Sequence, residues 1–146
     1  MQVDKSIILD LTNRVTSYEG KMKPVIFGGF IRDFLFYTLN DLSRTRSTLK
    51  DLDLWVSDER NEVEEKHFLN HFVQGAYNWK PNFEPKRSLY EFTGLNVVRY
   101  TIYDLSDRYL FTIDLVYCKN FPVNDLPVNL SSYDGSFHVH NTQNTS

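Results

Sequence analysis

The sequence predicts an α/β domain in which a short, twisted, mixed β-sheet carries helices mainly on one side. Three observations support this class. Apolar residues recur at helical spacing between Asp4 and Gly20, short apolar runs bounded by glycine or polar residues are typical of strands, and the two patterns alternate along the chain. With 146 residues, of which 41% are hydrophobic, the chain is long enough for one core. We therefore expect a single domain over residues 1–146.

The first half of the chain predicts a helix, a strand, a second helix and a second strand. Asp4 is a candidate N-cap for a helix that ends near Gly20. Residues 25–27 are a short apolar strand that two glycines stop, and residues 31–39 carry the apolar stripe of a helix. Residues 41–50 are polar and basic, which predicts a loop. Residues 51–56 alternate between polar and apolar, as a strand does.

The second half predicts one helix and two strands. A charged helix is expected from about Glu59 to Val73, and residues 76–88, rich in aromatics and proline, are expected to be irregular. Residues 95–103 and 109–117 are predicted strands that the turn D-L-S-D joins. Residues 136–146 are polar and are expected to be a flexible tail.

Composition narrows the classes of function. No apolar run approaches the ~20 residues of a membrane span and the N-terminus lacks a signal-peptide layout, so we expect a cytoplasmic protein with no membrane partner. The net charge of -3 lacks the positive excess that is typical of nucleic-acid-binding proteins. A nucleic-acid partner would therefore have to bind a local basic patch or be held by another chain. The single Cys118 is expected to be a packed strand residue in a reducing compartment.

Two carboxylates and a glycine turn are the candidate residues for metal and phosphate binding. Asp51 and Asp53 project from one face of a strand and offer the hard oxygen ligands that suit Mg²⁺. Such a pair alone is common on exposed strands. Here, however, Gly28 and Gly29 lie between a strand and a helix, where a phosphate can approach backbone N–H groups, and Arg32 can reach the same anion. The alternative is that the glycines only permit a tight turn and Arg32 is a surface charge.

A third carboxylate, Asp114, lies in the otherwise apolar segment L-F-T-I-D-L-V. An unpaired buried acid is costly, so Asp114 is either paired with a base such as Lys119 or is a third metal ligand. Three converging acids beside a phosphate cradle match two-metal phosphoryl transfer. The reaction class that the residues predict is nucleotidyl transfer.

Four motifs occur in an order that is typical of one family. They are G-G-F-I-R-D at residues 28–33, D-L-D-L at residues 51–54 after Lys50, D-L-V-Y-C-K at residues 114–119, and D-L-P-V-N-L-S-S-Y-D-G at residues 125–135. The chain thereby resembles the head domain, which is the catalytic domain, of class II CCA-adding enzymes and bacterial poly(A) polymerases, within the polymerase-β-like nucleotidyltransferase superfamily. The matches span residues 25–135.

The resemblance implies a nucleotidyltransferase fold and an Mg²⁺-dependent enzyme. It would transfer a nucleoside monophosphate from an NTP such as ATP to an acceptor hydroxyl, in RNA processing, and release pyrophosphate. The expected acceptor is the 3′ end of an RNA or tRNA, with a protein as the alternative acceptor. The implied site residues are Asp51 and Asp53 for two Mg²⁺ ions, Asp114 in support of them, Gly28, Gly29 and Arg32 for the triphosphate, and Lys50, Asp125 and Asn129 near the nucleotide.

Departures from the family pattern suggest a second interpretation. The segment between Asp33 and Asp51 is longer than is usual and carries Arg44 and Arg46, as a solvated loop or as a substrate contact. Residues 123–124 are Val-Asn where the family has two arginines. The family's neck, body and tail have no counterpart, so we expect a homo-oligomer or a partner subunit to replace them. The alternative function is a weak or inactive module that acts as a binding or regulatory subunit.

Three further groups of residues are weaker candidates. His67 and His71 lie four apart on the predicted helix but lack a third ligand, so a solvated face is favoured over a metal site. His138 and His140 are likewise discounted. An aromatic and basic cluster could stack single-stranded bases, although such aromatics more often close a small core or meet a partner; it comprises Tyr77, Trp79, Phe83 and Tyr90 with Lys80, Lys86 and Arg87.

Overall fold

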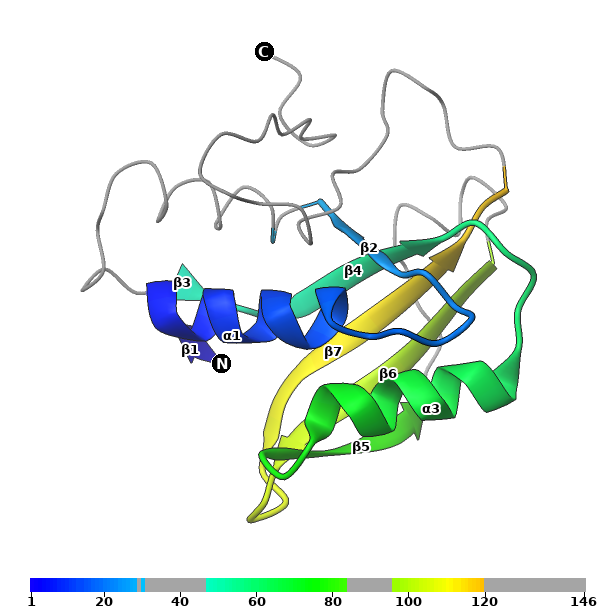
Figure 1. Cartoon of the computed structure of the whole chain (residues 1–146). Helices are drawn as coiled ribbons and strands as arrows, with labels where there is room; N and C mark the ends of the chain where they lie inside the picture. Colours follow the sequence, from blue (N-terminus) through cyan, green and yellow to red (C-terminus); the bar gives the residue numbers. More distant parts are fainter. Residues whose placement is uncertain (29, 31–46, 84–95, 120–146) are drawn as a thin grey trace.

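The computed structural model describes residues 1–28, 30, 47–83 and 96–119. Within them the architecture is mixed α/β, with a five-stranded mixed sheet, a separate two-stranded sheet and two helices (Figure 1). This confirms the predicted class.

The large sheet is built around a central parallel pair. Its strands lie in the order β2 (Val25–Phe27), β4 (Asp51–Val56), β7 (Tyr109–Tyr117), β6 (Asn96–Asp104) and β5 (Tyr77–Asn82). β4 and β7 are parallel, and every other neighbouring pair is antiparallel. The predicted strands at residues 25–27, 51–56, 95–103 and 109–117 are thereby confirmed to within a residue.

Both described helices lie on one face of this sheet (Figure 1). Helix α1 (Lys5–Thr16) begins at the predicted cap, where the Asp4 carboxylate accepts the Ile7 N–H at 3.0 Å. Helix α3 (Glu62–Val73) begins later than the sequence suggested. The reason is a second cap: the Asn61 side chain accepts the N–H groups of the first turn and fixes the start there.

The hydrophobic core lies between the two helices and the sheet. Alternate residues of β4 face it, and the side chains of Leu52, Leu54 and Val56 are at most 1% exposed. Burial of such side chains is the main favourable term in folding. The helices contribute Ile8, Leu11, Val15, Phe68, Leu69 and Phe72, and the other strands contribute Ile26, Ile102, Phe111, Ile113 and Leu115.

One stretch that was predicted to be irregular contains a strand. β5 pairs with β6 along its whole length even though it includes Pro81. Proline lacks an N–H and is tolerated on an edge strand, and β5 is the last strand of the sheet in the described part of the chain. Tyr77 and Trp79 anchor this strand because both pack against the core.

A short strand pairing was also missed. β1 (Gln2–Val3) pairs with β3 (Ser47–Thr48), and the N-terminal ammonium of Met1 donates to the Leu49 and Leu110 carbonyls at 2.8 and 3.1 Å. Pairings of two residues leave no periodicity to detect, because contacts distant in sequence determine them.

Several predicted segments lie outside the described residues. They are the helix of residues 31–39, the loop with Arg44 and Arg46, and the tail of residues 136–146. Of the helices in the described ranges, none has the length and apolar character needed to cross a membrane.

Candidate functional site

Three carboxylates lie on the sheet face opposite the helices. Because β4 alternates, Asp51 and Asp53 point away from the core, as the sequence predicted. The parallel register with β7 places Asp53 beside Asp114 and Asp51 beside Thr112. We call this surface the acid face. The sheet therefore gathers three acids that are far apart in sequence.

The glycine turn begins at the same place. Phe27, the last residue of β2, pairs with Asp53, so the next residue, Gly28, lies toward the start of β4. Gly28 has φ 77°, a left-handed conformation that glycine adopts without steric cost. The start of the turn thus lies next to the paired carboxylates. Gly29 and Arg32 are outside the described residues.

Asp114 is held by an arginine that the sequence did not reveal as its partner. Arg99 of β6 lies opposite Asp114 and donates from Nε to Oδ1 at 2.5 Å and from Nη2 to Oδ2 at 2.9 Å. The hydrogen bond to Asp114 raises the pKa of Arg99 against the opposing effect of burial, and the charges of Asp51 and Asp53 raise it further. Arg99 thus places a positive charge among the three acids.

This pairing corrects one expectation. Asp114 is only 2% exposed, so a paired acid was a sound alternative, but Lys119 is not its partner. Lys119 instead contacts Glu59 at 2.8 Å. Sequence position could not decide between the two bases, because the pairing depends on the antiparallel register of β6 and β7.

Asp51 is exposed, and its position is fixed by a neighbouring threonine. Thr112 donates its hydroxyl to Asp51 Oδ1 at 2.5 Å and its N–H to the Lys50 carbonyl at 3.0 Å. Lys50 is exposed, so its side chain is accessible to an anion from solvent. Asp53 is half-buried.

The fit to a metal ion differs among the three acids. Asp51, which is exposed, and Asp53, which is half-buried, present carboxylates on one strand face, and such ligands suit Mg²⁺ that keeps waters and substrate phosphates among its other ligands. Asp114, in contrast, uses both oxygens on Arg99. No group of three or more His, Cys, Asp or Glu side chains within residues 1–28, 30, 47–83 and 96–119 is arranged to hold a metal ion. Asp114 is therefore held in an ion pair, which leaves the D-x-D pair as the carboxylates on this face that could ligate a metal.

Other predicted residues do not join this site. Asp125 and Asn129, expected near the nucleotide, lie outside the described residues, as do His138 and His140. His67 is 62% exposed beside Glu64, and His71 shares a hydrogen bond with Ser17 at 2.9 Å. The two histidines of α3 therefore belong to a polar helix surface.

The predicted aromatic and basic cluster is divided by the sheet. Tyr77 stacks on Phe72, and Trp79 contacts Tyr100 edge to face, so both rings pack on the helix side. This confirms the core alternative for these two residues. Lys80 lies on the opposite face, Phe83 is 91% exposed, and Tyr90, Lys86 and Arg87 are outside the described residues.

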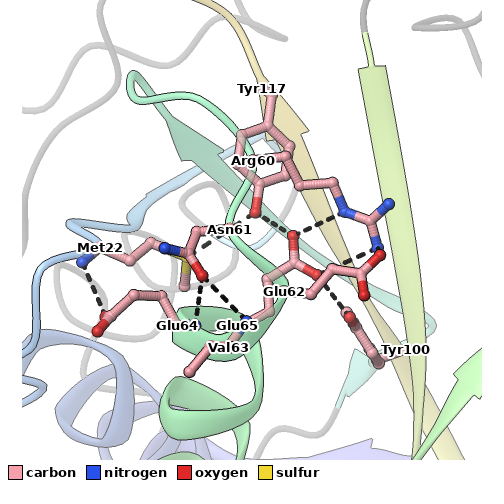
Figure 2. A network of polar contacts seen from close by, with 9 residues as sticks. All are labelled: Met22, Arg60, Asn61, Glu62, Val63, Glu64, Glu65, Tyr100 and Tyr117. Atoms are coloured by element: carbon pink, nitrogen blue, oxygen red, sulfur yellow. Dashed lines mark hydrogen bonds and ion pairs between the residues drawn. The ribbon is translucent and has the colours of Figure 1, made fainter.

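A second polar network, unforeseen in the sequence, lies on the helix side (Figure 2). Glu65 of α3 is fully buried and accepts hydrogen bonds from Tyr100 at 2.6 Å, from Tyr117, and from Arg60 Nε at 3.1 Å. Burial raises the pKa of both tyrosines, and their bonds to Glu65 raise it further. Because each buried group has a partner, we interpret the network as structural.

A pocket of about 200 Å³ adjoins this network and is lined by Lys21, Met22, Asp58, Glu59, Asn61, Glu64 and Tyr117. It lies on the helix side and shares no lining residue with the acid face.

Comparison of the chain with protein-family models, with curated proteins and with solved structures found no match.

Proposed function

We propose that the protein is an Mg²⁺-dependent nucleotidyltransferase with a nucleotidyltransferase fold, and that it transfers a nucleoside monophosphate from an NTP to an acceptor hydroxyl, most simply an RNA 3′ end. One observation carries the proposal: the register of β2, β4 and β7 aligns Phe27, Asp53 and Asp114, so the glycine turn begins beside three acids. A phosphate cradle next to carboxylates is what phosphoryl transfer requires.

Each residue has a role in this proposal. Asp51 and Asp53 bind Mg²⁺, which when bound neutralises the triphosphate and lowers the pKa of the attacking hydroxyl. Gly28 and the residue after it bring backbone N–H groups to the triphosphate. Thr112 orients Asp51 through its hydrogen bond of 2.5 Å. Arg99 orients Asp114 and lowers the repulsion among the three acids.

A second candidate function is a nucleotide-binding module without transfer activity. The ion pair between Arg99 and Asp114 favours it, because a carboxylate with both oxygens engaged is a poor metal ligand. Under this interpretation Asp51 and Asp53 hold a metal–nucleotide complex that is not consumed.

Transfer assays with each radiolabelled NTP, Mg²⁺ and a mixed RNA pool distinguish the two candidates. We expect label in RNA and release of pyrophosphate, both abolished by EDTA. Binding of Mg²⁺–NTP by calorimetry without any incorporation would support the module instead. If the protein neither binds Mg²⁺–NTP nor transfers label, both candidate functions are contradicted.

A further inference from the structure

An aromatic pair, of which Tyr109 is exposed and Tyr103 half-buried, lies at one end of the acid face. Tyr103 of β6 pairs with Tyr109 of β7, and their rings meet edge to face with centroids 6.5 Å apart. A register shift skips Leu110, so Tyr109 stays on the same face as Thr112. Bulges often re-aim side chains beside functional sites. Tyr109 is 59% exposed, so its ring is accessible from solvent.

The pair is continuous with the proposed catalytic acids. Thr112, on the same face as Tyr109, lies opposite Asp51 and hydrogen bonds to it. Burial raises the pKa of the Tyr109 phenol, and the charge of Asp51 raises it further, so the two groups share one electrostatic environment. Among the described residues of the acid face, an exposed carboxylate is thus followed by an aromatic surface.

A lysine completes this surface. Lys80 of β5 places its ammonium 4.8 Å from the centroid of the Tyr103 ring and 3.2 Å from Asp107. The side chains of Lys80 and Asp107 are 55% and 67% exposed, so this ion pair is weak and the ammonium remains available to another anion. An aromatic surface with a cation beside it suits a base and its phosphate.

We propose that Tyr109 and Tyr103, together with Lys80, form a stacking platform for a base near the 3′ end of a single-stranded RNA. This inference rests on the proposed function, in which the terminal hydroxyl of that RNA is the acceptor. A stacked base beside Asp51 keeps the neighbouring terminal ribose near the carboxylates. Stacking tolerates any base and requires an unpaired one, so the platform selects single strands without selecting sequence. Mg²⁺ at Asp51 and Asp53 removes the repulsion that the acids exert on the phosphates.

Fluorescence anisotropy with a short 5′-labelled single-stranded RNA, in Mg²⁺ and without NTP, tests this platform. Tyr109→Ala should weaken binding roughly tenfold, because one stacked base is lost. Tyr109→Phe retains the ring and should bind as the wild type does. Leu105→Ala changes a residue of the same hairpin that is 64% exposed but not aromatic, and it should have no effect. A duplex of the same sequence should bind more weakly than the single strand.

Equal RNA affinity of the wild type and Tyr109→Ala, or duplex binding as tight as single-strand binding, would overturn the platform. A Tyr109→Ala variant that raises only the KM for NTP would overturn it as well, because the ring would then contact the incoming nucleotide. Since the binding assay contains no NTP, failure of the platform leaves the transfer assay unaffected. Conversely, RNA binding that depends on the Tyr109 ring in a protein without transfer would support the platform and count against the enzyme.

Discussion

Two carboxylates on opposite sides of the sheet, Asp51 of β4 and Glu65 of α3, have different roles. Asp51 is exposed beside a hydroxyl that orients it, whereas Glu65 is fully buried among two phenols and a guanidinium. The first arrangement leaves a carboxylate oxygen accessible to a cation, and the second satisfies the carboxylate internally. Substitution should therefore affect activity at the first residue and stability at the second.

For the acid face, we expect Asp51→Asn or Asp53→Asn to reduce nucleotide transfer to background while the protein remains folded. Each change removes a charged metal ligand from an accessible strand face and keeps the shape of the side chain. Transfer rates and circular dichroism measure the two effects. Asp58→Asn, an exposed acid just after β4, is the matched control and should retain activity. Full activity of either acid-face variant would refute the metal assignment.

For the buried network, Glu65→Ala should lower the free energy of unfolding by about 3 kcal/mol, because it leaves two buried phenols and Arg60 without their acceptor. Glu62→Ala is the control on the same helix: its side chain is 67% exposed and contacts Arg60 at 3.3 Å, so less than about 1 kcal/mol should be lost. Urea denaturation of both variants gives the comparison. Similar losses for the two would mean that the buried contacts of Glu65 contribute no more than the exposed ion pair of Glu62, and would contradict the network.

At the scale of elements, strand register does most to assemble the site. The parallel pairing of β4 with β7 brings Asp53 to Asp114, and the antiparallel pairing of β6 with β7 brings Arg99 to the same carboxylate. A slip by one residue would turn these side chains into the core and expose apolar ones, so burial on the helix side fixes the register. Packing against the helices thus fixes the strand register that brings the acids together on the opposite face.

The connection from α3 to β5 gives a test of one element boundary. Gly75 follows the helix with φ 76°, and a methyl group added there would meet no atom within 4 Å. Gly75→Ala should therefore cost about 1 kcal/mol through the left-handed backbone alone, and Gly75→Asn should cost less because asparagine tolerates that conformation. Thermal unfolding measures both. Equal losses would contradict this explanation of the helix end.

At the scale of the whole molecule, local patterns were readable and long-range pairings were not. The alternation in Asp51–Val56 and the cap at Asp4 depend on neighbouring residues, and both predictions were confirmed. The partner of Asp114 and the bulge beside Tyr109 depend on register between β6 and β7. The sequence did not single out Glu65, because no local pattern distinguishes this buried acid from the exposed acids of the same helix.

The whole fold should lose stability in alkali in a way that reports the Glu64 and Glu65 contacts. Burial, then hydrogen bonding to Glu64, raises the pKa of Tyr18 to about 12, and burial with bonding to Glu65 raises the pKa of Tyr100 and Tyr117 as well. The unfolded chain releases these protons near pH 10, whereas the folded protein retains them. Their contribution is therefore complete below about pH 10 and is lost as the pH rises toward the folded pKa values.

We expect ultraviolet titration of the nine tyrosines to show a group that ionises only as the protein unfolds, and the midpoint of urea unfolding to fall steadily above about pH 10. Tyr117→Phe removes one of these protons and should make the fall less steep, whereas Tyr109→Phe changes an exposed ring outside the network and should leave more of the slope intact. If all tyrosines titrate together near pH 10 in a folded protein, Tyr18 does not bind Glu64, and Tyr100 and Tyr117 do not bind Glu65 as described.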